Sequence, residues 1–143
     1  MKHRILISLI AALLLGACAS IAATTDAKER GILSTKMMNL SSAVDTYFES
    51  LPEMPFDTNE NILKLATRHD PSLLAPEFQP YVLKAQYQNP YAVLLLCSKD
   101  GKQAIMEDAG CSARLDRQVT GHAPCAFTLA VQSGCQVKGG DPQ

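Results

Sequence analysis

The side chains with the clearest chemical potential in this 143-residue chain lie together in its last third. Glu107 and Asp108 are adjacent, Asp116 follows, and Arg114 and Arg117 flank Asp116. Such carboxylates could bind a cation or act as an acid–base pair. Calcium loops need several oxygen ligands at regular spacing, which this stretch lacks. We therefore expect a solvated strand end and no metal site.

Two histidines outside the N-terminal stretch are the other candidates for catalysis. His69 stands in Thr-Arg-His-Asp-Pro and His122 in Gly-His-Ala-Pro-Cys, so turn residues surround both and favour a solvated or capping role. Nucleophile-elbow, phosphate-loop and His-Glu-x-x-His motifs are missing. The sequence predicts no catalytic residues and no cofactor; an enzyme would require a pocket where either histidine meets remote carboxylates.

Four cysteines occur near the end of the chain: Cys97, Cys111, Cys125 and Cys135. In an oxidising compartment an even set predicts two disulfides, with three possible connectivities. A zinc site is the alternative, but it lacks a Cys-x-x-Cys pair and has only His122 nearby.

The fifth cysteine, Cys18, follows a short N-terminal stretch with a basic start, an apolar run over 5–15 and a small-residue end, as in secretory signals. Its apolar run is shorter than the roughly 20 residues of a spanning helix. Leu15-Gly16-Ala17-Cys18 resembles the lipobox of bacterial lipoproteins. The resemblance implies removal of residues 1–17, a lipid on Cys18 and, because Ala19 follows where retained lipoproteins have aspartate, an outer-membrane anchor. Ordinary cleavage at a nearby small-x-small site would instead release a soluble periplasmic protein.

Composition indicates one globular domain. Hydrophobic residues make up 47% and charged residues 19% of the chain, which is too apolar for intrinsic disorder. Without Lys2 and Arg4, 11 basic and 14 acidic residues remain, and this weak acidity argues against nucleic-acid binding.

Spacing of apolar residues by three and four predicts an amphipathic helix over 27–50. The stripe comprises Leu33, Met37, Leu40, Val44, Tyr47 and Leu51. Asp26 with Glu29 fits a capping box at its start, and Pro52 and Pro55 would end it. The stripe could instead bind a coiled-coil partner, although packing on its own domain is favoured because it covers few heptads.

A shorter helix is predicted over 58–68, with Asp57 and Glu60 as its capping pair. Asp70-Pro71 begins a further turn. The chain then changes to strand periodicity over 81–88, 91–98 and 102–107.

Turns at Asn89-Pro90 and Asp100-Gly101 separate these strands, and the second is a strong hairpin signal. Alternation at Cys125, Phe127, Leu129 and Val131 marks a fourth strand. The result is an α+β domain: an N-terminal amphipathic helix and a shorter helix packed on an antiparallel sheet of about four strands.

This meander suggests a disulfide pairing. Cys97 lies near the hairpin turn, while Cys111 lies about 20 Å away at the far end of the next strand. A fourth strand starting at Cys125 would place Cys111 beside Cys125 and return Cys135 toward Cys97. We therefore expect Cys111–Cys125 and Cys97–Cys135, although a bent third strand would restore sequential pairing.

Two further resemblances concern function. The long helix, four-stranded sheet and cysteine-bounded end resemble the layout of type IV pilins, without their Gly-Phe-Thr-Leu-Ile-Glu cleavage motif. Cys97-Ser98-Lys99-Asp100-Gly101, with the lipobox, is similar to small lipoprotein lysozyme inhibitors, without their Ser-Gly-Ser-x-x-Lys-Tyr loop.

The expected organisation is a signal over 1–17, a lipidated tether over 18–26, one periplasmic domain over 27–138 and a loose tail over 139–143. The expected function is that of an outer-membrane-anchored, non-enzymatic accessory or assembly factor, whose only added group is the lipid and whose partner is an envelope protein. The alternative is a binding module that inhibits a soluble enzyme such as a lysozyme or protease. The candidate partner-binding loop contains Glu107, Asp108, Arg114, Asp116 and Arg117, since a loop held on a rigid frame often carries recognition.

Overall fold

A computed structural model describes residues 2–50, 59–88 and 90–139. It contains two compact units, Met1–Ile32 and Leu33–Gln143, which are described separately. Some predicted features lie outside the described residues: Leu51, Pro52, Pro55, Asp57, Asn89 and most of the tail over 139–143.

The first unit consists of the N-terminal part of helix α1, which runs over Lys2–Glu49. The predicted capping box at Asp26 and Glu29 is wrong, because the helix continues through both residues. Alanine, the strongest helix former, is frequent just before them, which favours continuation. Asp26 instead lies 3.6 Å from Arg30 one turn later, as an exposed ion pair.

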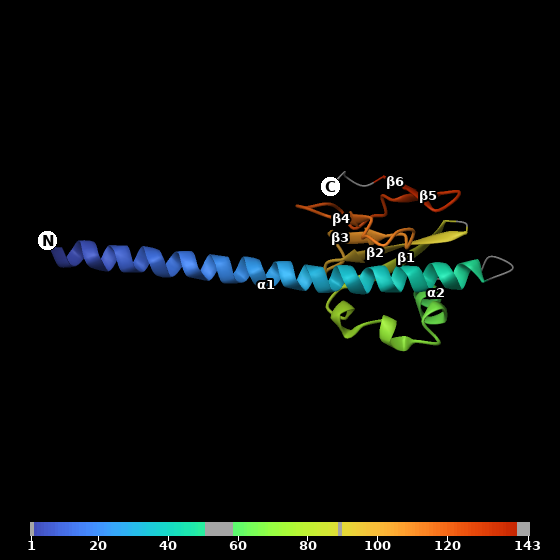
Figure 1. The fold of residues 1–143 in the computed structure, drawn as a ribbon, viewed down its shortest axis with the longest axis horizontal. Coiled ribbons are helices and arrows are strands. Elements are labelled where there is room, and N and C mark those ends of the chain that lie inside the picture. Colours follow the sequence, from blue (N-terminus) through green and yellow to red (C-terminus); the bar gives the residue numbers. More distant parts are fainter. Residues whose placement is uncertain (1, 51–58, 89, 140–143) are drawn as a thin grey trace. The chain divides into compact units, whose positions relative to one another are not determined.

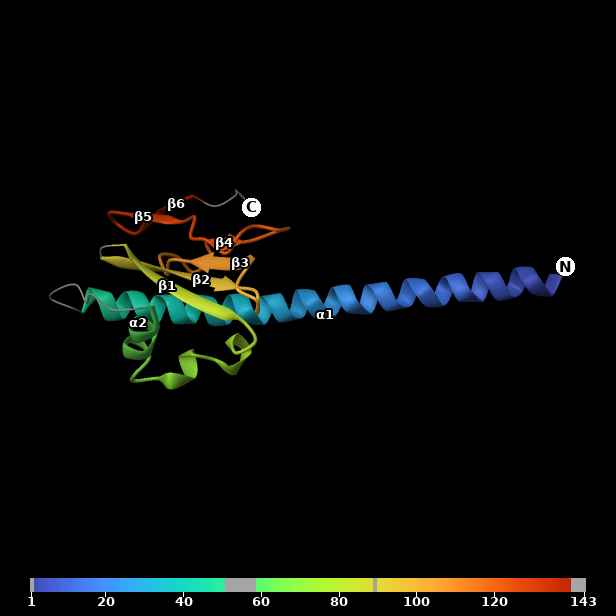
Figure 2. The same ribbon diagram turned by 180° about the vertical axis from the view of Figure 1, so that it is seen from behind.

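In the second unit, the C-terminal part of α1 carries the predicted apolar stripe. Leu33, Met37, Leu40 and Val44 are buried, as is Phe48, while Tyr47 packs at the edge of this core. The sheet lies to one side of this part of α1, and the short helices lie to the other (Figures 1 and 2).

The short helices agree with the sequence. Helix α2 spans Asn59–Ala66 and buries Ile62 and Leu63. The 3-10 turn η1 over Pro71–Leu73 begins at Asp70, whose side chain accepts a hydrogen bond from the Ser72 amide, and a second 3-10 turn, η2, spans Pro76–Phe78.

Four strands form an antiparallel meander in the order β1-β2-β3-β4. Their bounds are Val82–Gln88, Tyr91–Cys97, Ala104–Asp108 and Arg117–Gln118. The predicted hairpin turn is confirmed: Gly101 has a φ of +70° and its amide donates to the Ser98 carbonyl at 2.7 Å. The α+β class is therefore confirmed.

Strand β2 is apolar throughout because both of its faces are covered. Leu94 and Leu96 contribute to the core that contains α1, whereas Val93 and Leu95 pack against the C-terminal third of the chain. Alternate residues of a strand project to opposite faces, so this strand lies between two layers.

The predicted fourth strand is wrong. The main sheet ends with the two residues of β4, and the chain then runs back to the hairpin end, where Gln103 bridges Pro124 and the Cys125 amide donates to the Lys102 carbonyl. Only part of the predicted segment is a strand: β5 spans Ala130–Gln132 and pairs with β6, Gln136–Lys138, in a separate two-stranded sheet.

This additional reversal also changes the disulfides. The bonds are Cys97–Cys125 and Cys111–Cys135, so the expected Cys111–Cys125 and Cys97–Cys135 pairs are wrong. Because the chain returns along β3 before Cys125, that cysteine reaches the hairpin end, which holds Cys97. Cys135 then reaches the opposite end, beyond Asp108, which holds Cys111.

Peptide mapping without reduction checks this pairing. We expect one linked fragment pair containing Cys97 and Cys125 and another containing Cys111 and Cys135, both lost on reduction. A fragment that joins Cys97 to Cys135 would contradict the described path of the chain.

Candidate functional site

Glu107, on β3, is fully buried and holds together separate parts of the C-terminal third. Its carboxylate accepts the Thr128 amide at 2.8 Å, the Leu129 amide at 3.0 Å and the Thr128 hydroxyl at 2.8 Å. The Arg117 guanidinium on β4 donates to it at 3.1 Å. Four donors therefore satisfy one buried charge, as burial requires.

Asp108, the next residue, projects to the opposite face of β3, toward α1. One carboxyl oxygen contacts the Ser41 hydroxyl and the other accepts the Asp116 amide at 3.0 Å. Burial raises the pKa of Asp108 to about 6, although the hydrogen bonds from Ser41 and Asp116 oppose this increase.

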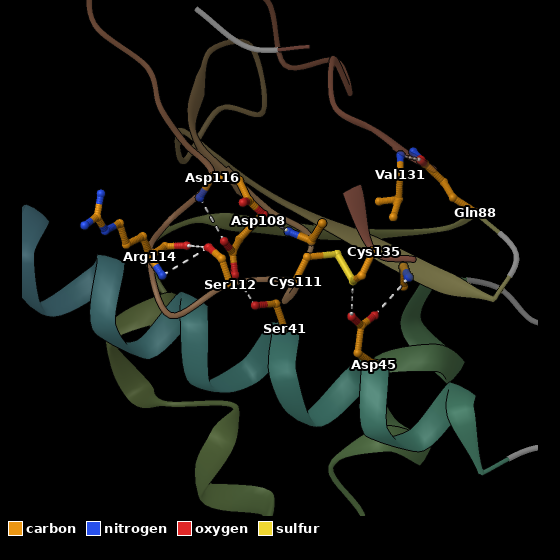
Figure 3. The surroundings of a disulfide bond; sticks show 12 residues. Ser41, Asp45, Gln88, Asp108, Cys111, Ser112, Arg114, Asp116, Val131 and Cys135 are labelled. Atoms are coloured by element: carbon orange, nitrogen blue, oxygen red, sulfur yellow. Dashed lines mark hydrogen bonds between the residues drawn. A yellow bond between two sulfur atoms is a disulfide. The ribbon is translucent and has the colours of Figure 1, made fainter. Parts of the chain in front are cut away.

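Asp45 completes this cluster from α1. It is 7% exposed, and one carboxyl oxygen accepts the Ala92 amide at 3.2 Å. Its other oxygen lies 3.9 Å from the Cys135 sulfur (Figure 3). Burial, with a smaller contribution from nearby acidic groups, raises the pKa of Asp45 to about 6 against the opposing effect of the Ala92 hydrogen bond.

Sequence reasoning missed Ser41 and Asp45. Both are polar, lie four residues apart and directly follow stripe residues Leu40 and Val44, so they share one edge of the buried helix face. Polar residues at that spacing beside a core stripe were the available signal.

Gly110 lets this face of α1 approach closely. It has a φ of +73°, and a Cβ placed there would lie 2.8 Å from the Ser41 carbonyl oxygen and 3.1 Å from an Asp45 carboxyl oxygen. A side chain would therefore be strained by its backbone conformation and would also collide with backbone.

The structure separates the five residues of the candidate partner loop into two groups. Glu107, Asp108 and Arg117 are buried, so the expectation of a solvated strand end is wrong. Arg114 is exposed, and Asp116 is half-buried with its carboxylate accepting the Ala109 amide at 2.8 Å. Most of the charge in this stretch therefore serves internal contacts at the two ends of the loop, and little of it faces solvent.

Both histidines are exposed, as the sequence favours. His69 accepts a hydrogen bond from Arg68 Nε at 2.8 Å and lines an open hollow of about 380 Å³ with Tyr47, Asp70 and Leu73.

One group in the described residues has the proximity expected of metal ligands. Asp45, Cys111 and Cys135 each place a potential ligand atom within 4.8 Å of the others. The two sulfurs are bonded to each other, so they are not available as thiolates, and the arrangement is that of a disulfide beside a carboxyl.

Comparisons with protein-family models, with curated proteins and with solved structures found no match. Among the described residues, no helix has both the length and the apolar character needed to cross a membrane.

The Glu107–Arg117 pair can be tested with a double-mutant cycle. Glu107→Gln leaves the Arg117 charge buried without its partner, and Arg117→Met does the same to Glu107, so each should lower the free energy of unfolding by about 3 kcal/mol or more. The double variant should lose less than the sum of the single variants. Urea unfolding monitored by circular dichroism measures these differences. The exposed Asp26–Arg30 pair is the control, and its coupling energy should be small. An equally small coupling energy between Glu107 and Arg117 would contradict the role of the buried pair.

Gly110→Ala should destabilise the protein more than Gly121→Ala. Both glycines have positive φ, +73° and +86°, so both variants pay a left-handed backbone cost of about 1 to 2 kcal/mol. Only Gly110 faces neighbouring backbone, because a Cβ at Gly121 meets nothing within 4 Å. Gly110→Ala should therefore lower the free energy of unfolding by about 1 to 3 kcal/mol more than Gly121→Ala, and this difference measures the collision with the Ser41 backbone. Equal losses would show that the contact is readily relieved.

Proposed function

We propose that this chain is an outer-membrane-anchored lipoprotein that acts as a non-enzymatic accessory or assembly factor by binding an envelope protein. The observation that carries the proposal is that several charged side chains of the C-terminal third are buried and make hydrogen bonds within the domain. Glu107, Asp108 and Arg117 fasten β3 to neighbouring segments, and every buried side-chain nitrogen or oxygen among the described residues has a hydrogen-bond partner. This pattern supports a rigid binding frame, and loops held on a rigid frame often carry recognition.

The lipobox supports the membrane anchor. Cleavage before Cys18 would leave the lipid on the first residue of a helix that continues to Glu49. Several acyl chains on that residue would give durable attachment, whereas one chain would be marginal.

The exposed part of the loop over 111–116 is the proposed contact surface. Cys111 fixes one end through its bond to Cys135, and Asp116 fixes the other through the Ala109 amide and Asp108. Between them Ser112 and Arg114 share hydrogen bonds and remain exposed. A short loop held at both ends presents its side chains with little loss of conformational entropy on binding.

The test is a crosslinking pull-down of the tagged protein from detergent-solubilised envelopes. We expect a specific envelope protein to be captured by the native chain, lost with Cys18→Ala and reduced with Arg114→Glu. Arg68→Glu is the matched control, because it reverses an exposed arginine outside the loop. Capture of only a soluble enzyme would reject the accessory role in favour of an inhibitor, and equal capture by all four forms would reject the anchor and the loop.

A second candidate is a pilin-like subunit. The 48 residues of α1, the antiparallel four-stranded meander and the disulfide-bonded C-terminal third have the layout that the sequence resembles. The mature N-terminus distinguishes the candidates. Mass spectrometry should find an acylated Cys18 at the N-terminus if the lipoprotein proposal holds, whereas an unacylated N-terminus that precedes Cys18 would favour the pilin-like subunit.

A further inference from the structure

The Ser41 hydroxyl has more hydrogen-bond contacts than it can supply as a donor. Its oxygen lies 3.1 Å from the Met38 carbonyl oxygen and also contacts an Asp108 carboxyl oxygen. A hydroxyl has one hydrogen and can donate to only one of these acceptors. Both contacts are satisfied when Asp108 is protonated, because the acid then donates to Ser41 while Ser41 donates to Met38.

Asp45 shows the same requirement. One of its oxygens accepts the Ala92 amide, and the other faces the Cys135 sulfur at 3.9 Å. A disulfide sulfur carries no hydrogen, so it cannot donate to a carboxylate. The contact is favourable when Asp45 is protonated and donates weakly to the sulfur.

The charges around the two carboxyl groups also favour their neutral forms. The charges that raise the pKa of Asp45 belong to Glu49 on α1, Asp108 on β3 and Asp116 in the following loop, and all are acidic. For Asp108 the charged neighbour is the Asp116 carboxylate, which also raises its pKa. From β2 and the disulfide, Asp45 meets only the Ala92 amide and an uncharged sulfur.

No cation compensates these carboxyl groups within the described residues. Neither Asp45 nor Asp108 forms an ion pair there. Arg117 is bound to Glu107, which projects from the other face of β3, and Arg114 points away from the cluster in Figure 3. Ionisation of both aspartates would therefore place uncompensated charges on α1 and β3, on either side of the close contact at Gly110.

We propose that Asp45 and Asp108 form a proton-controlled latch that holds the segment 109–116 and the Cys111–Cys135 disulfide against α1. The latch is closed when both carboxyl groups are protonated and is weakened when they ionise. It does not depend on the proposed anchor or partner.

The direction of the pH dependence follows from the raised pKa values. Both groups move from 3.8 to about 6 in the closed structure, so the closed structure binds protons more tightly than the open one. The stabilisation is fully present below about pH 4 and is lost as the pH rises through 6. Opening of the segment should thus increase on going from acidic to neutral conditions, by about tenfold per group between pH 5 and 7.5.

Carboxyl-carbon NMR titration and amide hydrogen exchange on the full chain in detergent micelles test the latch. We expect carboxyl midpoints near 6 for Asp45 and Asp108. After correction for intrinsic exchange, the amides of Ala109 and Asp116, which belong to the held segment, should open more at pH 7.5 than at pH 5. The Ala104 amide, which donates to Ala123 at the opposite end of the sheet, should show no such change. Midpoints near 4, or uniform exchange at both pH values, would overturn the proposal.

Asparagine variants provide the matched comparison. In Asp108→Asn and Asp45→Asn the amide nitrogen can donate where the protonated acid would, and the amide oxygen can still accept the backbone N–H. Each variant should remove about tenfold of the pH effect, and Asp26→Asn, the same change at an exposed aspartate, should remove none. Full pH dependence in both cluster variants would refute the latch, and the titration of the native protein decides the matter if a variant does not fold.

Discussion

The C-terminal third of this protein depends on one buried carboxylate. Between β3 and residue 139, where the described residues end, the strands are only two or three residues long, so regular backbone pairing can fasten little of this segment. Glu107 supplies the missing hydrogen bonds, because its two oxygens accept from Arg117, Thr128 and Leu129. A carboxylate can serve this way in the interior only when its hydrogen-bond capacity is filled and its charge is compensated, and both conditions are met here.

The neighbouring Asp108 has the opposite electrostatic character. Successive strand residues project to opposite faces, so the Glu107-Asp108 dipeptide fastens the C-terminal segment on one side and α1 on the other. Glu107 faces a guanidinium, whereas Asp108 faces a hydroxyl, a backbone amide and other acids. These surroundings favour the neutral form of Asp108, whose pKa burial raises to about 6.

The Asp100-Gly101 pair predicted the hairpin turn, and apolar spacing was enough to predict the buried face of α1, helix α2 and the first three strands. Apolar spacing failed after β3, for an identifiable reason. Cys125, Phe127 and Leu129 do alternate inward and pack against one face of the sheet. Their segment is held by hydrogen bonds to the Glu107 carboxylate, however, and not by backbone pairing with a neighbouring strand. The true fourth strand, Arg117–Gln118, is too short to show a period. Because the prediction placed the fourth strand after Cys125 instead of before it, it put Cys125 and Cys135 at the wrong ends of the sheet. The predicted disulfide partners were therefore exchanged.

The wrong end assigned to Cys135 also explains why the contact of Asp45 with the Cys111–Cys135 disulfide was not predicted. Asp45 lies beside Cys135 because Cys135 is bonded to Cys111 at the end of the sheet away from the hairpin, where Ser41 also contacts Asp108. At the hairpin end, Cys97–Cys125 and the backbone bonds of Lys102 and Ala104 fix the chain. The carboxyl group there, Asp100, accepts hydrogen bonds from the Ser98 hydroxyl and the Lys102 amide, which lower its pKa instead of raising it. At the other end, carboxyl contacts supplement the Cys111–Cys135 bond. A change in proton occupancy therefore acts on one end of the sheet, while the opposite disulfide keeps the rest of the domain in register.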